Sequence, residues 1–188
     1  MYILCDTCSV LMLIRIAPDM FIDAKYECLT ATEVRKEILQ TRKFKDQYPW
    51  RIDYKSNIIP NNSFINKDVN FQTTLDVIKN KIYVGTINRL TGRFFDLSRV
   101  DRFVAAYAVN YNLQISSTDR GLIDFLNQEF DTKNKYPLEI INMWVEKKIL
   151  TWNDERHKII EEWIVNKEPE QPQSAVHKFN KLTGYSFK

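Results

Sequence analysis

The sequence predicts an α/β fold in which a mostly parallel central sheet lies between two layers of helices. Short apolar segments that suit strands alternate with segments whose apolar residues recur every three or four positions, as in helices. The first apolar segment, residues 2–5, is continuous, which is typical of a strand buried on both faces of a parallel sheet. Because a repeated strand–helix order places crossover helices on both faces, we expect a three-layer α/β/α arrangement.

The composition is that of a globular protein with one core. At 188 residues, with 44% hydrophobic and 27% charged residues, the chain is long for one core and short for two full domains. The net charge of +3 is too small to indicate nucleic-acid binding by itself. We expect one domain over residues 1–143, a helical extension over 144–166 and a flexible tail over 167–188.

The cysteines and the apolar segments favour a reducing, cytoplasmic location. Cys5, Cys8 and Cys28 are odd in number, and the N-terminus lacks the basic start of a secretory leader. Cys5-x-x-Cys8 resembles a zinc or redox motif, but no second pair follows it, so buried free thiols are the better interpretation. Residues 11–17 are apolar but too few to cross a bilayer, which needs about 20.

Start and stop signals delimit the elements of the first half. After strand 2–5, Ser9 can cap a helix over residues 10–16, and Pro18 ends it. Strand 26–29 precedes Thr30 and Glu33, which match a capping box. The buried stripe of the helix that follows comprises Val34, Ile38 and Leu39. Residues 44–91 are the least readable, with a helix over 69–81 whose apolar side comprises Phe71, Leu75, Ile78 and Ile82.

The clearest helix begins at Ser98. Its apolar side chains recur at helical spacing and are Val100, Phe103, Val104, Tyr107 and Tyr111. Small side chains at Ala105 and Ala108 lie on the same side as Asp101, so another element can pack closely there. The helix should end at residues 110–112. The elements expected after it are strand 113–116, helix 121–130, strand 138–141, and amphipathic helices 143–150 and 153–165.

Two further segments can be interpreted either as binding surfaces or as parts of the structure without a binding role. The basic stretch 35–55 includes Tyr48 and Trp50, and it suits either a grip on a phosphate backbone or a solvated helix face. The aromatic C-terminal helices suit either homodimerisation or covering of the sheet.

Four acids fall at comparable junctions between strands and helices. Asp6 follows the first strand, Glu37 lies in the helix after the second, Asp101 lies near a helix start and Asp119 ends a later strand. Taken singly, each has a local explanation: Asp6, Asp101 and Asp119 can each cap a helix, and Glu37 can lie on a solvated face. Because the carboxyl ends of parallel strands meet at one edge, we expect the four carboxylates to converge there.

Converging carboxylates favour a divalent cation. Like charges at one site raise one another's pKa unless a cation lies among them, and Mg²⁺ and Mn²⁺ prefer oxygen ligands. Such a metal can activate water for attack on phosphorus. Only two histidines, His157 and His177, are present, both late in the chain, and four glycines leave no phosphate-cradling loop.

At these residues the sequence resembles the PIN-domain family. The family pattern is an aspartate closing the first strand, a glutamate in the helix after the second, an aspartate opening an alanine-rich helix, and a Thr/Ser-x-Asp at a later strand end. The corresponding residues here are Asp6, Glu37, Asp101 and Asp119, the last within Ser117-Thr118-Asp119. The resemblance spans roughly residues 1–143, and it leaves Glu33, one turn before Glu37, as an alternative to it.

The resemblance implies a PIN-like fold and a metal-dependent endoribonuclease. Asp6, Glu37, Asp101 and Asp119 would hold Mg²⁺ or Mn²⁺, and Thr118 would orient the last carboxylate or a metal-bound water. The substrate would be RNA, and an antitoxin protein would be a partner if the chain is a toxin. Asp124 suits either an outer position at the site or a solvated one. The alternative function is a non-catalytic PIN-like module that binds RNA or a protein.

Overall fold

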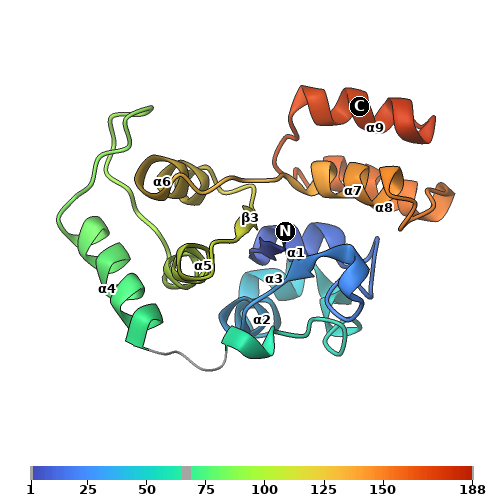
Figure 1. Ribbon diagram of the computed structural model, residues 1–188. Helices are drawn as coiled ribbons and strands as arrows, with labels where there is room; N and C mark the ends of the chain where they lie inside the picture. Colours follow the sequence, from blue (N-terminus) through green and yellow to red (C-terminus); the bar gives the residue numbers. More distant parts are fainter. Residues whose placement is uncertain (1, 65–68, 188) are drawn as a thin grey trace.

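A short parallel sheet lies at the centre of the molecule (Figure 1). The computed structural model describes residues 2–64 and 69–187. Within this part, β1 (Ile3–Cys5) pairs in parallel with both β2 (Cys28–Leu29) and β3 (Gln114–Ser116), in the order β2-β1-β3. Every residue of β1 is at most 1% exposed, so helices cover both faces of the strand. The expected α/β fold with a parallel sheet is confirmed at this level.

Helices make up most of the remaining structure. The α-helices are α1 (Thr7–Leu13), α2 (Thr32–Gln40), α3 (Arg42–Gln47), α4 (Val69–Tyr83), α5 (Arg99–Asn110), α6 (Arg120–Phe130), α7 (Pro137–Glu146), α8 (Asp154–Val165) and α9 (Gln173–Thr183). Short 3₁₀ turns are η1 (Ala24–Tyr26), η2 (Pro49–Ile52) and η3 (Asn62–Phe64). Among the described residues, no helix combines the length and apolarity that crossing a bilayer requires.

The starts of α1 and α2 differ from those expected. Helix α1 begins at Thr7, because the Asp6 carboxylate accepts the backbone N–H of Ser9 at 2.8 Å and so caps the helix three residues earlier. The capping box expected at Thr30 and Glu33 is wrong. The Thr30 hydroxyl instead donates to the Cys5 carbonyl at 3.4 Å, at the end of β1. The N-cap position of α2 is occupied by Ala31.

Helix α5 confirms the strongest local prediction. The Ser98 hydroxyl accepts the backbone N–H of Asp101 at 3.1 Å, and the Asp101 carboxylate accepts that of Ser98 at 3.0 Å, which forms a capping box. Helix α4 packs along α5, with the rings of Phe71 and Tyr107 stacked 4.5 Å apart. This packing fixes α5, and with it the helix start that carries Asp101.

The C-terminal region departs most from expectation. The strand expected over residues 138–141 is wrong, because this segment lies in α7, which Pro137 opens and which buries Trp144. The helix expected over 143–150 is correspondingly shifted. Residues 167–188, expected to be a flexible tail, include α9, whose Phe179 is fully buried. Helix α9 lies beside α7 and α8 (Figure 1).

Candidate metal centre

Two of the predicted acids follow neighbouring strands. Asp6 comes directly after β1, and Asp119 follows β3 by three residues. Cys5 pairs with Ser116 in the sheet, so the chain segments that leave β1 and β3 lie side by side. The Ser117 hydroxyl bridges these segments, because it donates to Asp6 Oδ2 at 2.5 Å and accepts the backbone N–H of Asp119 at 2.9 Å.

Asp6 is a buried carboxyl group with an unusual proton affinity. It is 3% exposed, and burial raises its pKa to about 7. Hydrogen bonds from Ser117 and Ser9 act in the opposite direction, and the negative charge of Asp101 raises the pKa further. Burial therefore favours the protonated form of this group, and a neighbouring cation would favour its charged form.

Asp101 and Asp119 extend this acidic group. Burial raises the pKa of Asp101, and the charge of Asp119 adds to that effect while Ser98 opposes it. Asp119 caps α6 by accepting the backbone N–H of Leu122 at 3.0 Å. Among the described residues, Asp101 Oδ1 and Asp119 Oδ2 accept no hydrogen bond. Helix capping therefore leaves one oxygen of each carboxylate open to another ligand.

The two glutamates of α2 face different neighbours. Glu37 Oε2 accepts the hydroxyl of Thr7, the first residue of α1, so Glu37 reaches the helix start next to Asp6. Glu33 accepts the Tyr107 hydroxyl at 3.3 Å, on the α5 side. These contacts favour Glu37 over Glu33 as the acid nearest to Asp6.

A hollow between α2 and the start of α5 combines acids with cations. It has a volume of about 460 Å³, and its lining includes Glu37, Lys36 and Arg99. Asp101 lies two residues after Arg99, in the same first turn of α5. Glu33 lines the hollow as well, so an anionic chain that entered it would meet the cations Lys36 and Arg99 beside two carboxylates.

Thr118 directly precedes Asp119 and is buried. The residue is 7% exposed, and in the described part of the chain its Oγ1 has no hydrogen-bond partner of standard geometry, although the Cys8 thiol lies near enough for Thr118 to oppose the rise in its pKa. Buried polar atoms normally form a hydrogen bond, so a buried hydroxyl without one at a candidate site is typical of a group that contacts a ligand. The Cys8 thiol lies close to this site as well, since burial and the charges of Asp6 and Asp119 raise its pKa.

The oxygen atoms of these side chains suit a hard divalent cation, but the side chains lie too far apart in this structure to hold one. Carboxylate and hydroxyl oxygens are the ligands that Mg²⁺ and Mn²⁺ prefer. Within residues 2–64 and 69–187, however, no three acidic, histidine or cysteine side chains are grouped closely enough to hold an ion. Chelation would therefore require movements that bring the carboxylates together.

Three residues of the basic stretch 35–55 make contacts inside the molecule. The Tyr48 ring is buried, and its hydroxyl donates to Glu168. Arg51 is also buried and donates to the Ile38 carbonyl at 2.9 Å. Trp50 lies beneath the Arg15 guanidinium, 5.1 Å from the ring centre. Tyr48 thus contacts the C-terminal segment, and Trp50 contacts the segment that follows α1.

Sequence reasoning passed over Ser117 and Thr7, which orient Asp6 and Glu37. Their positions in the sequence could have indicated these roles, because Ser117 directly follows the last residue of β3 and Thr7 directly follows Asp6. Asp124, for which two roles were open, accepts the side-chain amide of Asn88 at 2.9 Å. Comparison of the chain with family models, with curated proteins and with solved structures finds no match in any of the three.

Proposed function

We propose that this chain is a Mg²⁺- or Mn²⁺-dependent endoribonuclease of PIN-like organisation. One observation carries the proposal: the carboxylates of Asp6 and Asp119, which follow neighbouring strands, each lie within electrostatic range of Asp101 in the first turn of α5. Such an arrangement is costly for folding, because burial and mutual repulsion disfavour the charged groups. A bound cation would offset that cost, which is why buried carboxylates in this arrangement favour a metal site.

Asp6, Asp101 and Asp119 would hold the cation, with Glu37 completing the acidic group from α2. When bound, the metal supplies the positive charge that activates water and stabilises the charge developing on the phosphate oxygens. Ser117 keeps the Asp6 carboxylate oriented toward the site through its 2.5 Å hydrogen bond. The Thr118 hydroxyl supplies a donor for the carboxylate of Asp119 or for a water molecule.

The positively charged side chains of the hollow would bind the phosphate backbone of the RNA. Lys36 and Arg99 line it, and both are exposed, so they are available to phosphate groups. Arg99 lies 5.9 Å from the centre of the Phe103 ring. This contact would restrain the guanidinium beside the first turn of α5.

Cleavage of an RNA with blocked ends tests the proposal. The full chain is incubated with a doubly end-blocked fluorescent RNA and Mn²⁺, and products are resolved on a denaturing gel. We expect cleavage that EDTA abolishes and that Asp6→Asn or Asp101→Asn reduces by roughly 100-fold or more. Asp46→Asn, an exposed acid on α3, is the matched control and should keep full activity.

The result also separates the enzyme from a binding module. If the folded wild-type chain binds the RNA but cleaves none in Mg²⁺ or Mn²⁺, the non-catalytic alternative replaces the nuclease. If Asp6→Asn and Asp101→Asn cleave as fast as the wild type, the acidic group is not the catalytic centre. Circular dichroism of each variant establishes that any loss of activity does not come from unfolding.

A further inference from the structure

A hairpin between α4 and α5 projects from the body of the molecule. Ile87 and Phe94 form an antiparallel bridge, and the backbone N–H of Asn88 donates to the Arg93 carbonyl at 2.8 Å. In Figure 1 this hairpin extends beyond the upper end of α4, in pale green, away from the sheet. We use the name apolar hairpin for residues 83–95.

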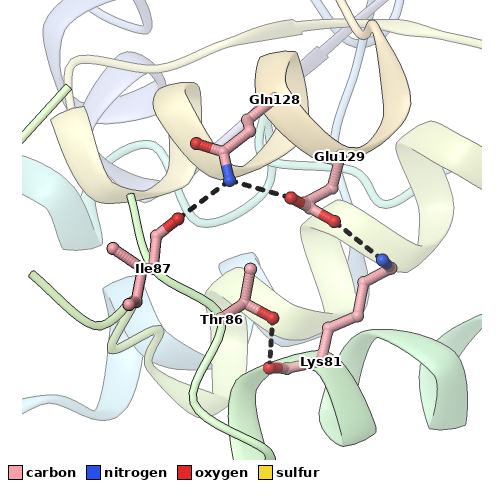
Figure 2. A network of polar contacts seen from close by, with 5 residues as sticks. All are labelled: Lys81, Thr86, Ile87, Gln128 and Glu129. Carbon is pink, nitrogen blue, oxygen red and sulfur yellow. Dashed lines mark hydrogen bonds and ion pairs between the residues drawn. The ribbon is translucent and has the colours of Figure 1, made fainter. Parts of the chain in front are cut away.

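A polar network fixes the apolar hairpin against α6 (Figure 2). The Gln128 side-chain amide donates to the Ile87 carbonyl at 2.9 Å and to Glu129 at 2.8 Å. Glu129 in turn accepts the ammonium group of Lys81, in the last turn of α4, at 2.7 Å. The Thr86 hydroxyl donates to the Lys81 carbonyl at 2.6 Å. One set of contacts thus joins α4, the hairpin and α6.

Two more contacts hold the far part of the hairpin. The Asn88 amide donates to Asp124 at 2.9 Å, and the backbone N–H of Arg89 donates to the Gln128 side-chain carbonyl at 2.9 Å. The surface is therefore ordered before any partner arrives. Binding to such a preorganised surface avoids most of the entropy cost of ordering a loop.

The fixed hairpin exposes large apolar side chains to water. Exposure reaches 89% for Tyr83, 82% for Leu90, 76% for Val84 and 70% for Phe94. Single exposed apolar residues are common, but several within one short, ordered segment mark an interaction site. The polar contacts join the hairpin to α4 and α6, whereas Tyr83, Val84, Leu90 and Phe94 are exposed to water.

Charge indicates the kind of partner. Residues 83–95 contain Arg89 and Arg93, both exposed, and no aspartate or glutamate; Asp96 follows directly, and Arg89 lies near Glu129 of α6. A complementary surface therefore carries carboxylates around apolar side chains. A two-fold contact between copies of this chain would bring the same arginines from both hairpins into one interface, which is unfavourable. A single-stranded RNA would satisfy the arginines and the aromatic rings but would not cover Val84, Ile87 and Leu90.

We propose that the apolar hairpin is the docking site for an acidic amphipathic segment of another protein. Leu90 and Phe94 insert between apolar side chains of that segment, and Arg89 and Arg93 pair with flanking carboxylates. The site lies on α4, the hairpin and α6, apart from the acidic group, so it does not depend on the proposed nuclease activity.

Selection of displayed peptides on the immobilised full chain tests the docking site. We expect random 16-residue peptides recovered on the wild type to be enriched in Leu, Ile, Phe or Trp together with Asp and Glu. Their affinity, measured by fluorescence polarisation, should fall at least about tenfold with Leu90→Ser and with Arg93→Glu. Val165→Ser is the control, because Val165 is 79% exposed on α8 and should leave affinity unchanged.

Several results would overturn the proposal. One is recovery of no binding peptide, and another is peptides without acidic bias that bind Leu90→Ser as tightly as the wild type. A concentration-dependent dimer in sedimentation that Leu90→Ser abolishes would assign the hairpin to a second copy. Binding of a labelled U₁₂ RNA that Leu90→Ser abolishes would assign it to RNA. Thermal melting of each variant establishes that the fold is intact.

Discussion

At the scale of single residues, the Asp6 carboxyl group combines two hydrogen bonds with almost complete burial. The hydrogen bonds from Ser9 and Ser117 orient the group, while the loss of water disfavours its charge. The balance favours the proton, since burial is the larger effect. A side chain that caps a helix is thereby made sensitive to pH and to cations.

This burial predicts a stability that falls as pH rises. The folded pKa of about 7 exceeds the ordinary value of 3.8, so between these pH values the native state binds more protons than the unfolded chain. In EDTA, Asp6→Asn should therefore raise the free energy of unfolding at pH 8 by roughly 2–4 kcal/mol and change it little at pH 4. Urea denaturation at both pH values measures the difference.

The control for this experiment is Asp46→Asn, which alters an exposed carboxylate. It should shift the free energy of unfolding by less than about 0.5 kcal/mol at either pH. An equal effect of both substitutions would contradict the assignment to burial of Asp6.

The orphan hydroxyl of Thr118 leads to a second prediction. Valine has nearly the same shape and removes a buried polar atom that has no hydrogen-bond partner of standard geometry in the described part of the chain. Thr118→Val should stabilise the metal-free protein by about 1 kcal/mol and lower the proposed ribonuclease activity. Thr118→Ser keeps the hydroxyl and should retain more of that activity than valine does. Urea denaturation and the gel assay measure the two effects, and a destabilised valine variant would show that the hydroxyl has a partner.

At the scale of elements, α9 stabilises the C-terminal half by packing. Phe179 is fully buried, and its ring meets Trp152 edge to face at 4.9 Å. The Asn142 amide of α7 donates to the Ala175 carbonyl at 2.8 Å, which fixes the start of α9. The helix is thus part of the core.

Truncation of this ring tests the role of α9. Phe179→Ala should lower the free energy of unfolding by about 3–5 kcal/mol, because it removes a buried ring and leaves a cavity. Tyr83→Ala removes a ring that is 89% exposed and should cost far less. A chemical denaturation curve of each variant gives the comparison, and equal losses would show that α9 does not contribute to the core.

At the scale of the whole molecule, the acidic group joins segments that are far apart in the chain. Asp6 and Asp119 follow neighbouring strands, and Asp101 lies in the first turn of α5, the helix that precedes β3. The unfolded chain has no comparable site, so a cation that binds here stabilises the native state alone.

Added metal should therefore stabilise the whole fold. At 100 times its dissociation constant, Mn²⁺ should raise the free energy of unfolding by about 2.7 kcal/mol. The effect should be larger at pH 8 than at pH 5.5, because protons compete for Asp6, whose pKa is about 7. Calorimetry with and without Mn²⁺ measures it, and Asp101→Asn should reduce it. An undiminished effect in Asp101→Asn would place the ion elsewhere.

The sequence predicted features that depend on neighbouring residues better than features that depend on contacts between distant segments. Helix α5 was predicted from Ser98, Asp101 and apolar spacing, since a capping box and a buried stripe are local features. The segment 138–141 was assigned to a strand because a short apolar run is buried in either structure. Thr30 and Glu33 match a capping-box motif in the sequence. In the structure the Thr30 hydroxyl donates to the Cys5 carbonyl of β1, and Glu33 accepts the Tyr107 hydroxyl.

The sequence by itself determined the parallel α/β class and the positions of the acids at strand ends, because hydrophobic periodicity and turn residues act within a few positions. Only the tertiary structure decided that Asp6 is buried, that Ser117 holds it, and that Glu37 approaches it through Thr7. It also decided that residues 83–95 form an ordered, exposed hairpin. The physical reason is that desolvation, charge repulsion and side-chain partners depend on segments that the chain brings together only when it folds.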